Sequence, residues 1–190
     1  TYTTKLLDGV DGLVTSVAGI GSLVIFLFTT TTRWAQADIA FAALILAGAC
    51  IGFLFMNWNP AKIFLGESGS LFLGFILGVL SIISGGKIAI ALLIMGIPVL
   101  DVIWTIIRRL LKKKNPFKFA DREHLHFRLL DAGLSPRQTV IAFSVVSLLF
   151  GLSALFLQSR GKLYTLLILG LLMITLIVAF NWLDRKRAMR

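Results

Sequence analysis

The sequence contains few charged residues, little proline and almost no cysteine. Charged side chains make up 15% of it, whereas about a quarter of an average soluble protein is charged. With 57% hydrophobic residues and only 4 prolines, a disordered or collagen-like chain is excluded. The single cysteine, Cys50, excludes an intrachain disulfide and a cysteine-based zinc site. A mean hydropathy of +0.91 over 190 residues instead indicates an all-α, polytopic membrane protein.

Six apolar stretches approach the roughly 20 residues that a bilayer-spanning helix needs. We expect the spans at residues 12–28, 39–56, 70–83, 88–107, 139–157 and 163–183. All 190 residues are then one integral-membrane domain, with a long basic loop over residues 108–137 before the fifth span. Aromatic and leucine side chains in that loop suggest a helix lying in the membrane interface.

The net charge of +10 is distributed unevenly between the two sides of this layout. If the 108–137 loop is cytoplasmic, residues 1–11, 57–69, 108–138 and 184–190 are all inside. All 19 lysines and arginines then lie inside, except Arg33, Lys87, Arg160 and Lys162. This bias is typical of membrane topology, so the charge requires no nucleic acid partner. Attraction of anionic lipid or phosphate remains an alternative role for the basic cluster at residues 112–114.

The acidic residues collect on the same inner side, together with both histidines. Of the 9 acids, only Asp38 and Asp101 lie elsewhere. The other seven are Asp8, Asp11, Glu67, Asp121, Glu123, Asp131 and Asp184. Five of them and both histidines fall in three inner segments, which would bring chemically capable groups to one membrane surface. Asp101 lies within a span, where an ionisable side chain is costly and therefore suggests a function. It either faces the inner cavity and binds substrate or forms a structural hydrogen bond to a neighbouring helix.

The first inner segment has the sequence DGVDGL at residues 8–13. Asp8 and Asp11 are three residues apart, so they would share one face of a helix. Gly9 and Gly12 would let a ligand approach the backbone closely. Such paired carboxylates can bind Mg²⁺ or ribose hydroxyls. The alternative is a helix N-cap followed by a turn, where Asp and Gly are both common.

The second inner segment, residues 57–70, contains Glu67 between two glycines at the expected start of a helix. Backbone amides there can bind phosphate, and a carboxylate in the same turn can hold a metal bound to that phosphate. Phe64 could stack on a base. The alternative is a capped membrane turn in which Ser68 or Ser70 is the N-cap.

The third inner segment, residues 116–130, carries His124 and His126 among acids and arginines. Histidines in this setting can handle protons or phosphate. Zinc is not expected, because the spacing matches no common site and no cysteine is near. The alternative is an interfacial amphipathic helix that buries its phenylalanines in the membrane, and such a helix could also present the histidines.

Taken in order, these segments resemble the polyprenyl-phosphate N-acetylhexosamine-1-phosphate transferases. The resemblance is carried by DGVDGL at residues 8–13, NPAKIFLGESGS at 59–70 and DREHLH at 121–126. The last of these, with GLSPRQ at 133–138, is more similar to the undecaprenyl-phosphate GlcNAc-1-phosphate branch than to the phospho-N-acetylmuramoyl-pentapeptide branch. The resemblance implies transfer of a sugar-1-phosphate from a UDP-N-acetylhexosamine to undecaprenyl phosphate, with release of UMP and with Mg²⁺ as cofactor.

The resemblance also implies roles for individual residues. Asp8, Asp11, Glu67, His124 and His126 are the expected catalytic residues, with Glu67 as metal ligand. Substrate binding is expected of six further residues: Asn59, Phe64, Gly66, Ser68, Asp101 and Arg122. The expected location is the bacterial inner membrane, with the active face cytoplasmic and membrane lipid as a partner. A homodimer is the oligomeric alternative left open.

Some positions depart from the pattern of that family. Glu67 stands where Asp is usual, and Phe127 stands where a third histidine is common. An aspartate pair expected upstream of Asp8 is absent, and the chain begins at Thr1. We therefore expect the C-terminal part of a larger transferase, with little turnover by itself. The alternatives are a non-catalytic membrane module that retains nucleotide or lipid-phosphate binding and, less favoured, a small carrier or channel.

Overall fold

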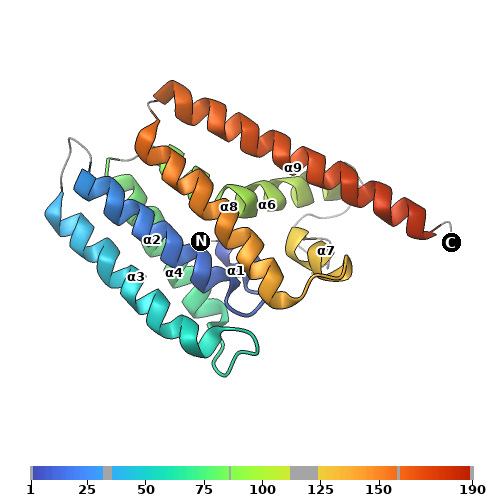
Figure 1. Ribbon diagram of the computed structural model, residues 1–190, viewed down its shortest axis with the longest axis horizontal. Helices are drawn as coiled ribbons and strands as arrows, with labels where there is room; N and C mark the ends of the chain where they lie inside the picture. The colour runs from blue at the N-terminus through green and yellow to red at the C-terminus, as the bar shows by residue number, and fades with distance from the viewer. Residues whose placement is uncertain (1, 32–35, 86, 112–123, 158, 189–190) are drawn as a thin grey trace.

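The computed structural model describes residues 2–31, 36–85, 87–111, 124–157 and 159–188. Every regular element within these ranges is a helix, which confirms the all-α expectation (Figure 1). The elements are α1 (Tyr2–Leu7), α2 (Leu13–Thr31), α3 (Ala37–Asn57), α4 (Gly66–Ile83), α5 (Lys87–Ile94), α6 (Gly96–Leu111), α7 (Leu125–Asp131), α8 (Pro136–Phe156) and α9 (Ser159–Ala188).

Within the described ranges, α2, α3, α4 and α8 are long and apolar enough to cross a membrane. They coincide with the first, second, third and fifth expected spans. The third is longer than its apolar core at residues 70–83, because α4 already begins at Gly66. The sixth expected stretch lies within α9. The expected class of polytopic membrane protein is thereby confirmed.

The fourth expected span is not one helix. Residues 88–107 form α5 and α6, which are separated at Met95. Pro98 has no N–H group, so it cannot donate a hydrogen bond to the carbonyl of Ile94. Glycine at position 96 weakens the helix further at the same point. The prediction of an uninterrupted helix was wrong here because apolar length alone does not register this break.

Helix α2 lies at the centre of the bundle, packed against α3, α4 and α8. Close approach of these helices depends on small residues, as is common in membrane bundles. A Cβ added to Gly21 on α2 would stand 3.0 Å from Cδ1 of Leu77 on α4, and one added to Gly151 on α8 would stand 3.0 Å from Cγ2 of Val24 on α2. Ser22 donates its hydroxyl hydrogen to the carbonyl of Ala18 over 2.8 Å, so this buried polar side chain is satisfied within its own helix.

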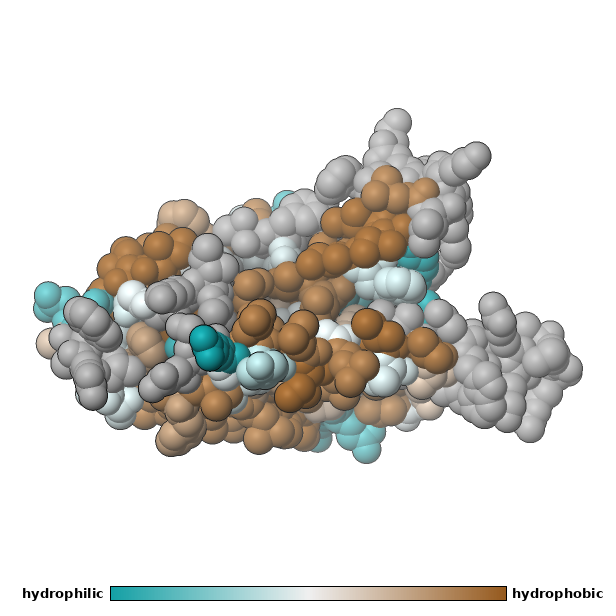
Figure 2. All heavy atoms as spheres, turned by 90° about the horizontal axis from the view of Figure 1, so that it is seen from above, coloured by the Kyte–Doolittle hydropathy of each residue, from teal (hydrophilic) through white to brown (hydrophobic). Residues whose placement is uncertain are grey.

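The outer faces of the bundle carry large apolar side chains. Figure 2 shows broad hydrophobic areas on one such face of the molecule. Phe41 and Phe55 on α3 are 66% and 80% exposed, and Leu149 on α8 is 62% exposed. A water-soluble protein rarely exposes contiguous apolar surface of this extent, whereas lipid tails cover it without cost.

Three connecting segments meet at one end of the bundle: the α1–α2 turn, the α3–α4 loop and the region from His124 to the start of α8 (Figure 1). Helix α8 begins there in a capping box, in which Ser135 Oγ accepts from the Gln138 amide and the Gln138 side chain accepts from the Ser135 amide. The ammonium group of Lys162 lies 5.1 Å from the centre of the Phe28 ring, near the C-terminal end of α2. This contact joins the end of the first expected span to the start of the sixth, and the alternating layout places these two ends on the same side of the membrane.

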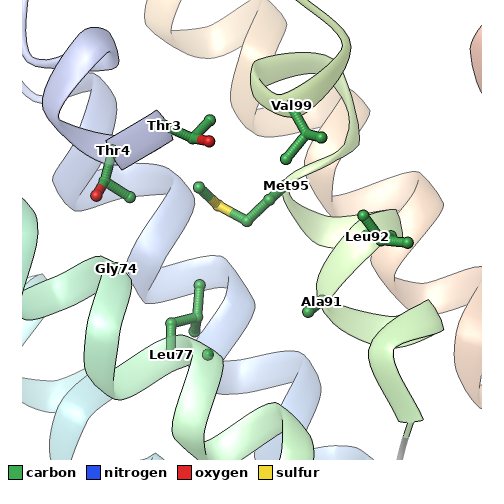
Figure 3. Close-up of a pocket in the computed structure, with 9 residues that line it drawn as sticks. Thr3, Thr4, Gly74, Leu77, Ala91, Leu92, Met95 and Val99 are labelled. Carbon is green, nitrogen blue, oxygen red and sulfur yellow. The ribbon is translucent and has the colours of Figure 1, made fainter. Parts of the chain in front are cut away.

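A small cavity of about 170 Å³ opens between α1, α4, α5 and α6 (Figure 3). Its wall is mainly aliphatic, and its polar side chains are two threonines. None of the residues expected in the site belongs to this wall. The lining residues are Thr3, Thr4, Gly74, Leu77, Gly78, Ala91, Leu92, Met95 and Val99. The cavity offers no charged group, so the chemistry has to be sought at the polar end of the bundle.

Candidate active site

Asp8 and Asp11 lie in the turn between α1 and α2 rather than on one helix face, so the helical interpretation of their spacing was wrong. The turn is anchored by the buried side chains of Leu7 and Val10, and it ends at Gly12, whose φ of 77° favours glycine. Asp8 is exposed, but partial burial and the neighbouring charge of Asp11 raise the pKa of its carboxyl to about 6.

Asp11 connects this turn to the α3–α4 loop. Its Oδ2 accepts hydrogen bonds from Asn59 Nδ2 at 3.0 Å and from the Ala61 amide at 3.2 Å. The carbonyl of Asn59 in turn accepts from Nε of Arg137 at 2.7 Å. Two of the expected site residues, Asp11 and Asn59, are thus in direct contact. Arg137 extends the link to the start of α8, a role that its place in the sequence did not indicate.

Asn57 also connects the α1–α2 turn to the α3–α4 loop, and it was not among the residues expected from the sequence. Its Oδ1 accepts from the Gly12 amide at 3.1 Å and from the Thr15 hydroxyl at 2.8 Å. Its Nδ2 donates to the carbonyl of Ile63 at 2.9 Å. The only available signal was a polar residue closing an apolar helix. Such a residue is equally common at a solvated helix end.

The residues expected to recognise nucleotide and phosphate lie on the exposed side of this loop. Phe64 is 71% exposed, and Gly66, Glu67 and Ser68 are exposed at the first turn of α4. Leu65 is the N-cap of α4, so the alternative interpretation with Ser68 or Ser70 as the cap was wrong. Ser70 is buried and donates its hydroxyl to the carbonyl of Glu67 at 2.9 Å.

Asp101 is buried on α6 and binds the start of α7 with both carboxylate oxygens. Oδ2 lies 2.9 Å from Nδ1 of His124, and Oδ1 accepts from the Leu125 amide at 2.9 Å. The Thr105 hydroxyl lies 3.5 Å from the same Nδ1. This geometry favours the structural hydrogen bond over direct substrate binding, the two alternatives that the sequence left open.

The two histidines stack and bring α7 against the α1–α2 turn. The His124 and His126 rings are parallel within 4°, with centroids 5.7 Å apart. A Cβ placed on Gly9 would stand 3.0 Å from Nε2 of His126 and 2.8 Å from Cζ of Phe127. The first and third segments therefore touch, and only glycine fits between them. Burial lowers the pKa of His126 to about 4, so its ring is neutral at pH 7.

Helix α7 lies within the 108–137 loop, where an interfacial helix was expected. Its Leu125 and His126 side chains are buried against the protein, and Phe127 packs on Gly9. The expected substrate-binding Arg122 lies outside the described residues. Within the described ranges, no group of three or more acidic, histidine or cysteine side chains is arranged to hold a metal ion.

Residues 3–85 match the family described as glycosyl transferase family 4. The chain is similar to a probable undecaprenyl-phosphate N-acetylglucosaminyl 1-phosphate transferase of Bacillus subtilis (strain 168), with 36% identity over 90% of this chain and 48% of the relative. It is similar to a decaprenyl-phosphate N-acetylglucosaminephosphotransferase of Mycolicibacterium smegmatis, with 32% identity over 92% of this chain and 48% of the relative.

A third relative is a phospho-N-acetylmuramoyl-pentapeptide-transferase of Halalkalibacterium halodurans, with 35% identity over 81% of this chain and 46% of the relative. The chain spans about half the length of these curated relatives. The family match over residues 3–85 covers the α1–α2 turn, the α3–α4 loop and α4, which contain the first two polar segments.

Proposed function

Because the chain belongs to glycosyl transferase family 4, we propose that the whole protein transfers a sugar-1-phosphate from a UDP-N-acetylhexosamine to undecaprenyl phosphate. An oxygen of the lipid phosphate forms a bond to the β-phosphorus, the bond to the bridging oxygen breaks, and UMP leaves. The observation that carries the proposal is the convergence of three polar segments at one end of an otherwise apolar bundle. UDP-GlcNAc is the proposed donor, by similarity to the named relatives.

We propose that the exposed rim of the α3–α4 loop binds the nucleotide. Phe64 offers an exposed ring on which uracil can stack. Gly66 has a φ of 70° and no heavy atom within 4 Å of a Cβ position, so a phosphate can approach its backbone. Ser68 and Asn59 supply hydrogen-bonding groups nearby in the chain, and Arg122 is proposed as a further phosphate ligand.

We propose that Asp8, Asp11, His124 and His126 line the reaction site. Asp11 is held by Asn59 and Ala61, so its position is fixed before substrate arrives. With a pKa near 6, Asp8 is ionised at pH 7 but can still hold a proton at modest cost. The neutral ring of His126 adds no charge beside the two aspartates, and Asp101 is buried against His124 rather than exposed to substrate.

Mg²⁺ fits the donor set at this end of the bundle, since Asp8 and Glu67 are exposed carboxylates there, the hard oxygen ligands that it prefers. We propose that Glu67, exposed in the first turn of α4, holds the ion together with oxygens of the diphosphate and water. When bound, Mg²⁺ neutralises the charge that develops on the diphosphate. We place the enzyme in the bacterial inner membrane with this end cytoplasmic, as a monomer or homodimer.

The proposal is tested on the full-length protein in detergent, with UDP-GlcNAc and undecaprenyl phosphate, by the release of UMP. Glu67→Gln should lower kcat about 100-fold or more, because it removes a charge that holds the metal. Glu67→Asp is the matched control and should retain most of the turnover. Equal activity of Glu67→Gln and wild type would remove Glu67 from the metal site. Binding of a uridine nucleotide without turnover would favour a non-catalytic module instead.

A further inference from the structure

Asp101 differs from Asp8, Asp11 and Glu67, because it is buried and both of its carboxylate oxygens form contacts within the protein. Its residue is 6% exposed, and its two carboxylate oxygens bind two successive residues at the start of α7. Buried carboxylates are costly unless they are paired and hydrogen-bonded. Both oxygens are engaged by the start of α7, at His124 and Leu125, so a direct contact with substrate does not explain this residue.

The contact with Asp101 fixes which ring nitrogen of His124 faces α6. Oδ2 of Asp101 lies 2.9 Å from Nδ1, and an ionised carboxylate only accepts hydrogen bonds, so the proton of this bond lies on Nδ1 whenever Asp101 is ionised. In the Nδ1–H tautomer of the ring, the lone pair is on Nε2. The Thr105 hydroxyl, at 3.5 Å from Nδ1, is too far away to compete. A second bond, from the Leu125 amide, fixes the carboxylate itself in orientation.

The same pair also fixes where the ring stands. Helix α7 begins at Leu125, and its first turn is tied to α6 through Asp101. His124 stacks in parallel on His126, and His126 in turn lies against Gly9 of the α1–α2 turn. One buried carboxylate thus orients the His124 ring, which stacks on His126 beside the turn that carries Asp8 and Asp11.

We propose that Asp101 is a positioning residue for the transfer reaction: it holds His124 in the tautomer that presents an unprotonated Nε2 toward the phosphate groups. This inference rests on the proposed function. It assigns Asp101 a role through His124 and no contact with substrate. His124 Nε2 then accepts a hydrogen bond from a protonated phosphate oxygen or from a water bound to it.

Asp101→Asn separates this role from a merely structural one. Asparagine has nearly the same shape, and its carbonyl oxygen can still accept from the Leu125 amide. Its NH₂ group, however, donates to His124 Nδ1 and so moves the ring proton to Nε2. Thr105→Val is the matched control, because it alters a neighbour of the same nitrogen and leaves the carboxylate in place. Asp101→Glu tests whether a carboxylate restores the tautomer.

The first readout is the ¹⁵N spectrum of histidine-labelled full-length protein at pH 8, where neutral rings predominate. These 190 residues contain two histidines, and the signals that disappear in His124→Gln and in His126→Gln variants of the full-length protein assign them. We expect the proton on Nδ1 of His124 in the wild type and in Thr105→Val, and on Nε2 in Asp101→Asn. An unchanged tautomer in Asp101→Asn would overturn the proposal.

The second readout is UMP release by the same variants. We expect Asp101→Asn to lower kcat by about 10²–10⁴-fold, with KM changed less than about threefold, since a wrong tautomer impairs the reaction more than binding. Asp101→Glu should recover part of kcat. Full kcat in Asp101→Asn with a switched tautomer would also overturn the proposal. If the wild type shows no turnover, the proposed function fails, and the spectrum alone decides whether Asp101 sets His124.

Discussion

Replacing Asn57 with leucine should destabilise the protein by about 2–4 kcal/mol. The side chain is 4% exposed and makes three hydrogen bonds, to the Gly12 amide, the Thr15 hydroxyl and the Ile63 carbonyl. Leucine has a similar volume but no polar atom. The Thr15 hydroxyl can rotate to another acceptor, whereas the two backbone groups lose their partner. The buried Gly12 amide without a partner costs about 1–3 kcal/mol, and loss of the partly buried bond to the Ile63 carbonyl adds about 1 kcal/mol, because water can reach the exposed Ile63.

Thr15→Val is the matched control for this substitution. It removes one of the three hydrogen bonds, while Asn57 Oδ1 still accepts from the Gly12 amide. Its expected cost is therefore about 1 kcal/mol. The double variant should be less destabilised than the sum of the two single variants, because the hydrogen bond between Thr15 and Asn57 is then counted only once.

Unfolding of the purified protein by SDS in mixed micelles, followed by circular dichroism, measures these free energies. We expect the midpoint of Asn57→Leu to fall well below that of Thr15→Val, and both to fall below wild type. If Asn57→Leu were no less stable than Thr15→Val, the three hydrogen bonds would not hold the α1–α2 turn to the α3–α4 loop. The account of the site as a prearranged frame would then be wrong.

Three further outcomes follow from the packing of the polar end. Gly9→Ala should cost about 1–3 kcal/mol in the same titration, since the new Cβ would meet Phe127 at 2.8 Å. Gly78→Ala is the control, because nothing lies within 4 Å of a Cβ at this position, and it should leave the stability unchanged or raise it. If Gly9→Ala and Gly78→Ala changed the stability equally, the contact between Gly9 and Phe127 would be contradicted. The folded pKa of Asp8 is raised from 3.8 to about 6, so the stability that its protonation contributes is lost as the pH rises through that window. Asp8→Asn should therefore be more stable than wild type at pH 7 and equal to it below pH 4; a constant difference between the two would argue against the raised pKa. The folded pKa of His126 is lowered from 6.5 to about 4, so the stability of the folded protein falls as the pH falls from 6.5 toward 4. The His126 ring should therefore remain neutral above pH 5 when its NMR signals are followed against pH. A titration midpoint near pH 6.5 would contradict the burial of the ring.

The apolar runs predicted the helices well, because a bilayer or a membrane-protein core requires the same long stretches wherever they pack. Five of the six expected stretches each lie largely within one helix. The break between α5 and α6 was missed, although Gly96 and Pro98 were visible in the sequence. Composition reports how much apolar surface a segment has, whereas a break depends on single backbone hydrogen bonds.

The candidate residues were proposed from the sequence, since acids and histidines are rare in this chain, and both histidines and five of the nine acids lie in three segments. Their spacing was less informative. Asp8 and Asp11 interact across a turn and not along a helix, and the N-cap of α4 is Leu65 and not a serine. Local spacing predicts contacts only when the secondary structure is already known.

By itself, the sequence determined the fold class, the approximate positions of the helices and the polar segments that meet at one end of the bundle. Hydrophobicity and residue type are properties of each segment, so they can be read without knowing its neighbours. Only the tertiary structure decided the pairings: Asp101 with His124, Asn57 with Gly12, and Gly9 with Phe127. Each pair joins residues far apart in the chain, and whether they meet depends on how closely whole helices pack.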